Sequence, residues 1–326
     1  MNLVDLFDSL VTPDGNEMIF NALPIPDYPN YRIAIDHDGN PVVLLSVNDR
    51  VKNSLLKNFK LKYLQLQQNV ECKIFENGNL SFKTFTVITF TNIDRNLQEY
   101  FLRISETLIR TLELNPTQQQ IIDSLSKFIE VFRSLSDIPT KTVHGLWAEL
   151  FLIDNSRNPE ILLNYWHNIP EEKFDFNSGK EKIEVKSNAN FERIHIFSSE
   201  QLNPPLGHKV LIASVFIRQS STGKDIGQLL DCISVKIRDD IQLIEKLNRI
   251  VCATLGNTLE QSIKLKFDYK IAQDSLKFYK CEDISKIEEI NIPNEVSEVK
   301  YKSDLSKIVA YNFQNTTSKG VLFHGL

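Results

Sequence analysis

The sequence has few cysteines, no long hydrophobic run and no excess of positive charge. Among its 326 residues are only four cysteines, Cys72, Cys232, Cys252 and Cys281, which are widely spaced and form no CxxC pair. A zinc site or a disulfide framework is therefore not expected, and the thiols are interpreted as isolated buried side chains. No apolar run reaches the roughly 18 residues that a transmembrane helix needs, so no membrane association is predicted.

The charge balance excludes one class of nucleic-acid-binding protein. The formal net charge is -5 and the isoelectric point is about 5.8, whereas a histone-like protein needs a strongly basic face. A nuclease is not excluded, because active-site carboxylates add negative charge while a local basic patch can bind DNA. The first residues, MNLVDLFDSLVTPDGNE, lack the basic segment and apolar run of a secretory signal, so we expect a cytoplasmic protein.

Patterns along the chain predict an α/β (α+β) protein. Two pairs of β-rich runs flank the turn dipeptides Asp38-Gly39 and Asn77-Gly78, which indicates two hairpins. Apolar residues at helical spacing follow, and a second helical run begins after Asn115-Pro116. The four predicted segments are an N-terminal arm with a β-rich module (1–95), a helical linker (96–139), an α-β-β-β-α-β core (140–218) and a mainly helical C-terminal extension (219–326).

Within the predicted core, the stretch KFDFNSGKEKIEVKSNANF places charged residues inside two short β-rich runs. A two-residue turn at Gly179-Lys180, with glycine first, suits a tight antiparallel hairpin. This register sets Asp175 opposite Glu184, and Lys186 lies two residues further along on the same face. Apolar side chains alternate onto the other face, so the charged face meets either a cleft or water.

Two carboxylates directly opposite each other repel, which destabilises a hairpin. A divalent cation between Asp175 and Glu184 would reverse the sign of this interaction, because Mg²⁺ (or Mn²⁺) takes carboxylate, phosphate and water oxygens as ligands. The backbone carbonyl of Val185 could complete the ligand set, and Lys186 could orient the attacking water. The alternative interpretation is a solvated hairpin face with a cross-strand ion pair.

A third acid lies in the apolar helix that precedes the hairpin. In TVHGLWAELFLID, Glu149 is the only charged residue between Val143 and Ile153. A glutamate on an apolar face is rarely buried without a partner. A metal, a metal-bound water or a base could be that partner. The alternative is a helix charge that reaches solvent or pairs with a nearby lysine.

Together these residues resemble the PD-(D/E)XK nuclease superfamily of restriction-type enzymes. The resemblance rests on a helix with a glutamate, then an aspartate, then Glu-x-Lys on the next strand, although Phe174 stands where the superfamily has its leading proline. The segments GLWAELFLI, YW, FDF, IEVKS and RIHIFSSEQL are similar to a bacterial PD-(D/E)XK group associated with restriction or phage-defence gene clusters. The resemblance covers roughly residues 140–215.

The resemblance implies a restriction-endonuclease-like core, with the N-terminal β-rich module and the helical C-terminal extension as additions. It implies that Asp175 and Glu184 are metal ligands and that Lys186 is the base that orients water. Glu149 would bind the metal or its water shell. Gln201 is a further candidate, because related nucleases often carry a polar residue on the helix after the third strand.

Several side chains near this pattern have a structural interpretation beside the functional one. Ser198-x-x-Gln201 is also a capping-box pattern, and the cap is favoured for Gln201. Ser187 could touch phosphate, although serine is common at the end of a strand. His144 and His195 could act as general bases, but structural roles are favoured for both.

Candidate DNA contacts lie in the densest basic stretch, RVKNSLLKNFKLKYLQ. Such lysines usually contact phosphates, and the interleaved Phe59 and Tyr63 could stack on exposed bases. A solvated face is equally consistent with the pattern. The candidate residues are Lys52, Lys57, Lys60 and Lys62.

The sequence therefore predicts a Mg²⁺-dependent DNA endonuclease in restriction or phage defence. Cutting both strands of a duplex would favour a homodimer, and the resemblance suggests ATPase, helicase or methyltransferase subunits as partners. The alternative is a catalytically inactive nuclease fold that serves as a DNA-binding or scaffold subunit of a defence complex, although the intact Asp, Glu and Lys argue against it. A nuclease that acts on RNA or branched DNA is a third option.

Overall fold

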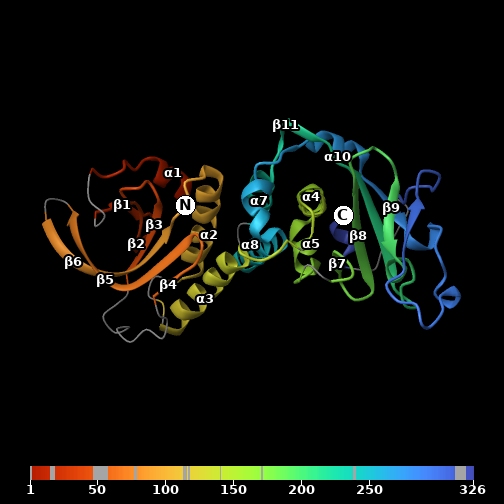
Figure 1. The fold of residues 1–326 in the computed structure, drawn as a ribbon, viewed down its shortest axis with the longest axis horizontal. Helices are drawn as coiled ribbons and strands as arrows, with labels where there is room; N and C mark the ends of the chain where they lie inside the picture. Colours follow the sequence, from red (N-terminus) through yellow and green to blue (C-terminus); the bar gives the residue numbers. More distant parts are fainter. Residues whose placement is uncertain are drawn as a thin grey trace. The chain divides into compact units, whose positions relative to one another are not determined.

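The chain divides into two compact units, Met1–Asp137 and Ile138–Leu326, and each unit has its own sheet and helices (Figure 1). Of the predicted segments, the helical linker thus falls almost entirely in the first unit, while the core and the C-terminal extension fall in the second. The computed structural model describes residues 2–14, 19–46, 58–76, 79–112, 116, 118–139, 141–169, 172–237, 240–312 and 321–326.

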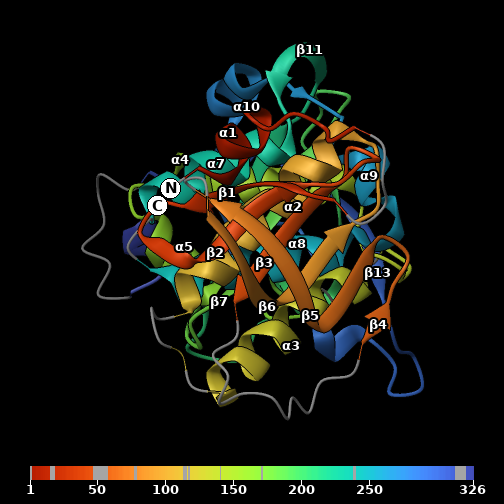
Figure 2. The same ribbon diagram turned by 90° about the vertical axis from the view of Figure 1, so that its left-hand side faces the viewer.

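The first unit is built on a six-stranded antiparallel sheet with the order β1-β2-β3-β6-β5-β4 (Figure 2). The predicted hairpin at Asp38-Gly39 joins β2 to β3, and Gly39 there has a φ of +81°. The second predicted hairpin joins β5 to β6, but Asn77 and Gly78 themselves lie outside the described residues. The strands are β1 (Asn21–Ile25), β2 (Tyr28–Ile35), β3 (Pro41–Ser46), β4 (Phe59–Lys60), β5 (Leu64–Glu76) and β6 (Asn79–Phe90).

The N-terminal segment is more regular than the expected arm. Helix α1 (Leu3–Asp8) begins at Asn2, whose side chain accepts hydrogen bonds from the second and third backbone N–H groups. The proline-rich segment that follows contributes β1, which pairs with β2 at one edge of the sheet. Pro24 is tolerated in this strand because an edge strand leaves one row of its backbone groups outside the ladder.

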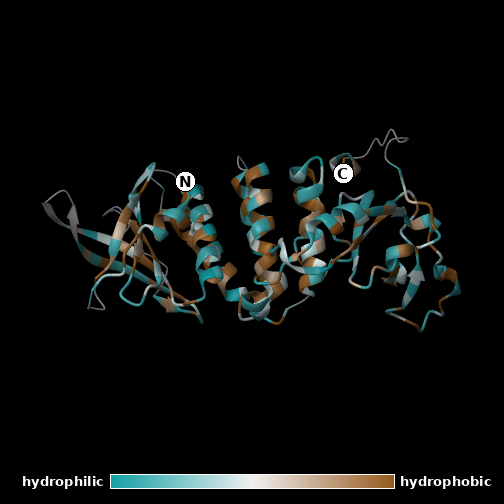
Figure 3. Ribbon diagram, turned by 90° about the horizontal axis from the view of Figure 1, so that it is seen from above, coloured by the Kyte–Doolittle hydropathy of each residue, from teal (hydrophilic) through white to brown (hydrophobic). Residues whose placement is uncertain are grey.

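Two helices, α2 (Arg95–Thr111) and α3 (Gln118–Ser134), cover the first sheet through aromatic side chains. Phe90 of β6 stacks on Phe101 of α2 with ring centroids 5.0 Å apart, and Phe132 of α3 lies 5.8 Å from both rings. In Figure 3 hydrophobic and hydrophilic residues alternate along the helices, as expected for elements with one buried face. The helical pattern predicted for this segment is confirmed.

The second unit contains a four-stranded sheet with the order β12-β10-β8-β7, in which β10 runs parallel to β8. A separate two-stranded sheet pairs β9 with β13. The strands are β7 (Phe176–Asn177), β8 (Glu181–Asn188), β9 (Ile194–Ser198), β10 (Lys209–Phe216), β11 (Gln219–Lys224), β12 (Lys277–Lys280) and β13 (Lys300–Asp304). The helices are α4 (Val143–Asn155), α5 (Pro159–Tyr165), α6 (Ser199–Leu202), α7 (Ile226–Lys236), α8 (Ile241–Leu255), α9 (Leu259–Ser262) and α10 (Tyr269–Ser275).

The predicted α/β class and the order α4, β7, β8, β9, α6, β10 are confirmed, with three differences. Helix α5 intervenes between α4 and β7. Strand β9 hydrogen-bonds to β13 from the C-terminal part, where Tyr301 pairs with Phe197. The C-terminal extension is also less helical than expected, because it supplies β12 to the main sheet. The four residues of β12 show too short a pattern to predict, and they pair with β10 because Tyr279 is buried among Val210 and Ile212.

No helix within the described ranges is long and apolar enough to cross a membrane.

Gly223 of β11 lies against the backbone of Phe267, and this close contact can be tested by mutation. An added Cβ would clash with the backbone carbonyl of Phe267 and lie 2.8 Å from its nitrogen. We expect Gly223→Ala to lower the free energy of unfolding by about 1–3 kcal/mol, measured by urea denaturation. Gly145→Ala is the control, since its Cβ would meet only the hydroxyl of Thr142 at 3.6 Å. Equal stability of the two variants would contradict the close approach of β11 to Phe267.

Candidate active site

Glu149 lies in the middle of a helix that is buried almost all round. Helix α4 begins after Thr142, whose Oγ1 accepts a hydrogen bond from the N–H of Gly145. Every residue from Leu146 to Asp154 is buried, and Glu149 itself is only 2% exposed. A carboxylate at this depth requires hydrogen-bond or charged partners.

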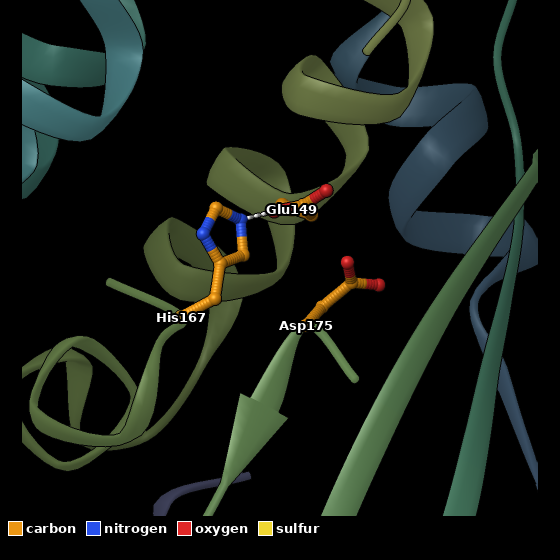
Figure 4. Close-up of side chains that lie close together, drawn as sticks. All are labelled: Glu149, His167 and Asp175. Carbon is orange, nitrogen blue, oxygen red and sulfur yellow. Dashed lines mark hydrogen bonds and ion pairs between the residues drawn. The ribbon is translucent and has the colours of Figure 1, made fainter. Parts of the chain in front are cut away.

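Three side chains supply those partners. The ammonium of Lys141 donates to Oε1 of Glu149 at 2.8 Å, and the indole N–H of Trp166 donates to Oε2 at 2.8 Å. Nε2 of His167 lies 2.9 Å from the same Oε2, as Figure 4 shows. Burial by itself raises the pKa of Glu149, but the charge of Lys141 and the bond to His167 outweigh it and lower the pKa to about 2. Glu149 is therefore ionised.

The hairpin adopts the predicted register at two pairs of residues, but the predicted pair of Asp175 with Glu184 is not part of the ladder. Phe176 pairs with Ile183 and Asn177 pairs with Lys182. Gly179 begins the turn with a φ of +85°, a conformation that favours glycine. The pairing of β7 with β8 ends at Phe176, so the residue before it is free to direct its side chain along β8.

That residue, Asp175, uses both of its carboxylate oxygens. Oδ1 accepts a hydrogen bond from Lys141 Nζ at 2.6 Å, and Oδ2 accepts one from the backbone N–H of Val185 at 2.8 Å. In an extended strand the N–H and C=O of one residue point to the same side, so the carbonyl of Val185 shares this edge of β8. Burial and the nearby charge of Glu149 raise the pKa of Asp175, although Lys141 and Val185 oppose them.

The ammonium of Lys186 contacts the carboxyl group of Glu184 on β8. Lys186 Nζ lies 2.7 Å from Oε1 of Glu184, which is 6% exposed. Burial, and then the charge of Asp175, raise the pKa of Glu184 to about 8 in spite of Lys186. The capping box predicted for Gln201 is present, because its Oε1 accepts from the N–H of Ser198 at the start of α6 at 3.2 Å. The same oxygen accepts from Lys186 Nζ at 3.2 Å, and a functional role for Gln201 stays a prediction.

Two residues that contact Glu149, namely Lys141 and His167, are not predicted from the sequence. With Glu149 and Asp175 they form a cluster of buried or partly buried side chains. Lys141 precedes α4, and His167 follows α5, where it is buried. Nε2 of His167 and one oxygen each of Glu149 and Asp175 all lie within 4.8 Å of one another. No spacing links either residue to Glu149, because neither shares its helix. The signal in the sequence is the unpartnered charge of Glu149, for which a nearby lysine is one possible partner.

The other predicted histidines have structural contacts. The ring of His144 packs edge-on against Phe267, with centroids 5.0 Å apart. His195 is buried, and its Nε2 lies 2.7 Å from Oγ of Ser214. Burial, followed by the charges of Lys186 and Arg193, lowers the pKa of His195 to about 4. Ser187 follows Lys186 in β8 and is half-buried.

The predicted DNA contacts belong to the first unit. Lys60 is exposed in β4, and the ammonium of Lys62 lies 4.5 Å above the ring of Tyr63. Lys52 and Lys57 lie outside the described residues. A role of these lysines in DNA binding stays a prediction.

The chemistry of the donor set fits a divalent cation. Carboxylate oxygens are the ligands that Mg²⁺ and Mn²⁺ prefer, and Glu149 and Asp175 each bring one oxygen close to Nε2 of His167. Glu184 is not part of this group of ligand atoms. The carbonyl of Val185 lies on the edge of β8 that Asp175 contacts. Burial raises the pKa of both Glu184 and Asp175, and the charge of a neighbouring acid adds to it, Asp175 for Glu184 and Glu149 for Asp175. A divalent cation would favour their ionised forms.

The pKa of Glu184 predicts how stability depends on pH. Between its ordinary value near 4.5 and about 8, the folded protein holds a proton that the unfolded chain has released. The contribution of Glu184 to stability is therefore complete below pH 4.5 and is lost as the pH rises to 8. Over this pH range the free energy of unfolding should decrease by at most roughly 4–5 kcal/mol because of Glu184. In Glu184→Gln this decrease should be smaller. Urea denaturation in EDTA at several pH values measures it.

Glu200→Gln is the control for this experiment, because Glu200 is an exposed carboxylate on α6. It should keep the pH dependence of the unaltered protein. If the free energy of unfolding of Glu184→Gln depended on pH as it does in the unaltered protein, Glu184 would be ionised throughout this range.

Comparison with known proteins identifies the family of the chain. A family model described as "Putative PD-(D/E)XK family member, (DUF4420)" matches residues 5–306. Searches of curated proteins and of solved structures return no match. The match spans both units, and the mixed α/β architecture is compatible with a restriction-endonuclease-like α+β fold. The resemblance seen in the sequence is thereby confirmed, and the chain belongs to this PD-(D/E)XK family.

Proposed function

We propose that the protein is a Mg²⁺-dependent (or Mn²⁺-dependent) DNA endonuclease of a restriction or phage-defence system. Family membership supports nuclease activity. The observation that carries the proposal is the burial of Asp175 and Glu184, which are 5% and 6% exposed beside Lys186 and Glu149. A solvated hairpin face would leave these acids in water. Burying several acids together is costly, which is the expected signature of a functional site.

In this proposal Asp175, Glu184 and the carbonyl of Val185 would hold the metal, while Glu149 would bind it or its water shell. When bound, the cation would polarise the phosphate and lower the pKa of a bound water. The protein contributes positioning, since Val185 orients the carboxylate of Asp175 and Trp166 orients that of Glu149.

Lys186 would orient the water that attacks the phosphorus in line with the departing oxygen. Its ammonium also offsets the negative charge that builds up on the phosphoryl oxygens. Gln201 and Glu184 hold this ammonium between α6 and β8, so that it is directed before substrate arrives. A homodimer would provide one such site for each strand of a duplex, and ATPase, helicase or methyltransferase subunits are the partners we propose.

A second candidate function is an inactive nuclease fold that serves as a DNA-binding or scaffold subunit. One observation favours it, because the ammonium of Lys141 forms ion pairs with both Asp175 and Glu149. The intact Glu184–Lys186 pair favours the enzyme, since a scaffold has no need to bury it.

Replacing Lys186 distinguishes the two candidates. We expect Lys186→Met to reduce Mg²⁺-dependent nicking of plasmid DNA by about 10²–10⁴-fold, because the variant cannot orient the water by charge. Lys209→Met is the matched control, an exposed lysine on the neighbouring strand β10 that should retain full activity. Unchanged cleavage by Lys186→Met would contradict the catalytic assignment. Absence of cleavage by the unaltered protein, with its partner subunits present, would favour the scaffold.

A further inference from the structure

The ammonium of Lys141 lies between two of the proposed metal-binding acids. It is 2.6 Å from Oδ1 of Asp175 and 2.8 Å from Oε1 of Glu149, and 3.4 Å from Nε2 of His167. The ammonium thus bridges two carboxylates that come from different elements. A divalent cation bound between these acids would use the same region of space.

The ammonium of Lys141 and a divalent cation would compete for the same oxygens of Asp175 and Glu149. The second oxygen of Asp175 is held by the backbone of Val185, and the second oxygen of Glu149 is held by Trp166 and His167. The oxygens left to face a cation are therefore the two that Lys141 contacts. An ammonium and a divalent cation beside the same carboxylates also repel each other, and the repulsion is strong where water is excluded.

We propose that Lys141 is an intramolecular competitor of the divalent cation, which must displace the ammonium from Asp175 and Glu149 to bind. This inference rests on the proposed metal-dependent function and adds a residue that sets the metal affinity of the site. Lys141 supplies the positive charge beside the two acids until the cation replaces it. The ammonium then moves toward solvent.

Lys141 is the member of the cluster that can move. Its side chain is 21% exposed, whereas those of Glu149 and Asp175 are 3% and 8% exposed. It precedes the N-cap Thr142, so its backbone lies outside the hydrogen bonds of α4. A lysine has four rotatable side-chain bonds, and a change of rotamer can carry its ammonium to water without moving the helix.

Binding of Mn²⁺ to the full chain, measured by isothermal titration calorimetry, tests the competition. Lys141→Met removes the charge at similar volume and should lower the Kd for Mn²⁺ by about tenfold or more, the factor expected for one charge-assisted hydrogen bond. Without metal, the variant should melt at a lower temperature than the unaltered protein. Mn²⁺ should then raise its melting temperature by a larger amount.

A matched control is Lys236→Met. Lys236 also pairs with a buried acid, since its Nζ lies 2.6 Å from Oδ1 of Asp154 outside the cluster. This variant should lose stability without a change in Mn²⁺ affinity. A merely structural role for Lys141 predicts the same result for Lys141→Met, so an unchanged or weaker affinity in that variant would overturn the competition and leave the proposed nuclease intact.

Chemical labelling of the unaltered protein covers the case in which Lys141→Met does not fold. Amine labelling followed by mass spectrometry should show that Mn²⁺ increases the reactivity of Lys141, while that of the exposed Lys270 stays constant. Constant or reduced labelling of Lys141 while Mn²⁺ binds elsewhere in the same sample overturns the inference. If neither the unaltered protein nor Lys141→Met binds Mn²⁺, the metal-dependent function itself fails, and the competition fails with it.

Discussion

The cost of burying carboxylates governs the architecture of the second unit. Glu149, Asp175 and Glu184 are all nearly inaccessible to water, and each is held by a lysine or by a hydrogen-bond donor. The surrounding elements are arranged to supply these partners. Helix α4 carries one acid, the short hairpin of β7 and β8 carries two, and the segment after α5 brings an indole and an imidazole to the same point.

The two lysines have different surroundings, which suggests different tasks within the proposed site. Lys186 is held on three sides, by Glu184, by Gln201 and by the face of Phe197, whose centroid lies 5.3 Å away. It is fixed in direction, as a group that orients water has to be. Lys141 instead bridges two acids from a position outside any helix or strand. These surroundings are consistent with the roles we propose, in which Lys186 orients water and Lys141 competes with the metal.

Local features of the sequence are sufficient to predict the hairpin and to indicate that Glu149 has a partner. The register follows from the Gly179 turn, because a two-residue turn with glycine first determines which residues of the two strands pair. The charge of Glu149 conflicts with its apolar helix, and that conflict alone indicates a partner. By contrast, the pairing of β9 with β13 and of β10 with β12 joins segments far apart in the chain. Such pairings depend on packing that no local pattern records.

Sequence patterns are sufficient to predict the PD-(D/E)XK family, the α/β class and the pairing of β7 with β8. They also suggest the four charged side chains of the proposed site. All of these depend on periodicity, turn chemistry and short motifs, which act over a few residues. Which further groups lie beside these side chains depends on how the elements pack in three dimensions. Lys141 and His167 meet Glu149 and Asp175 because α4, α5 and the hairpin pack together, and the positions of side chains from different elements are set by that packing alone.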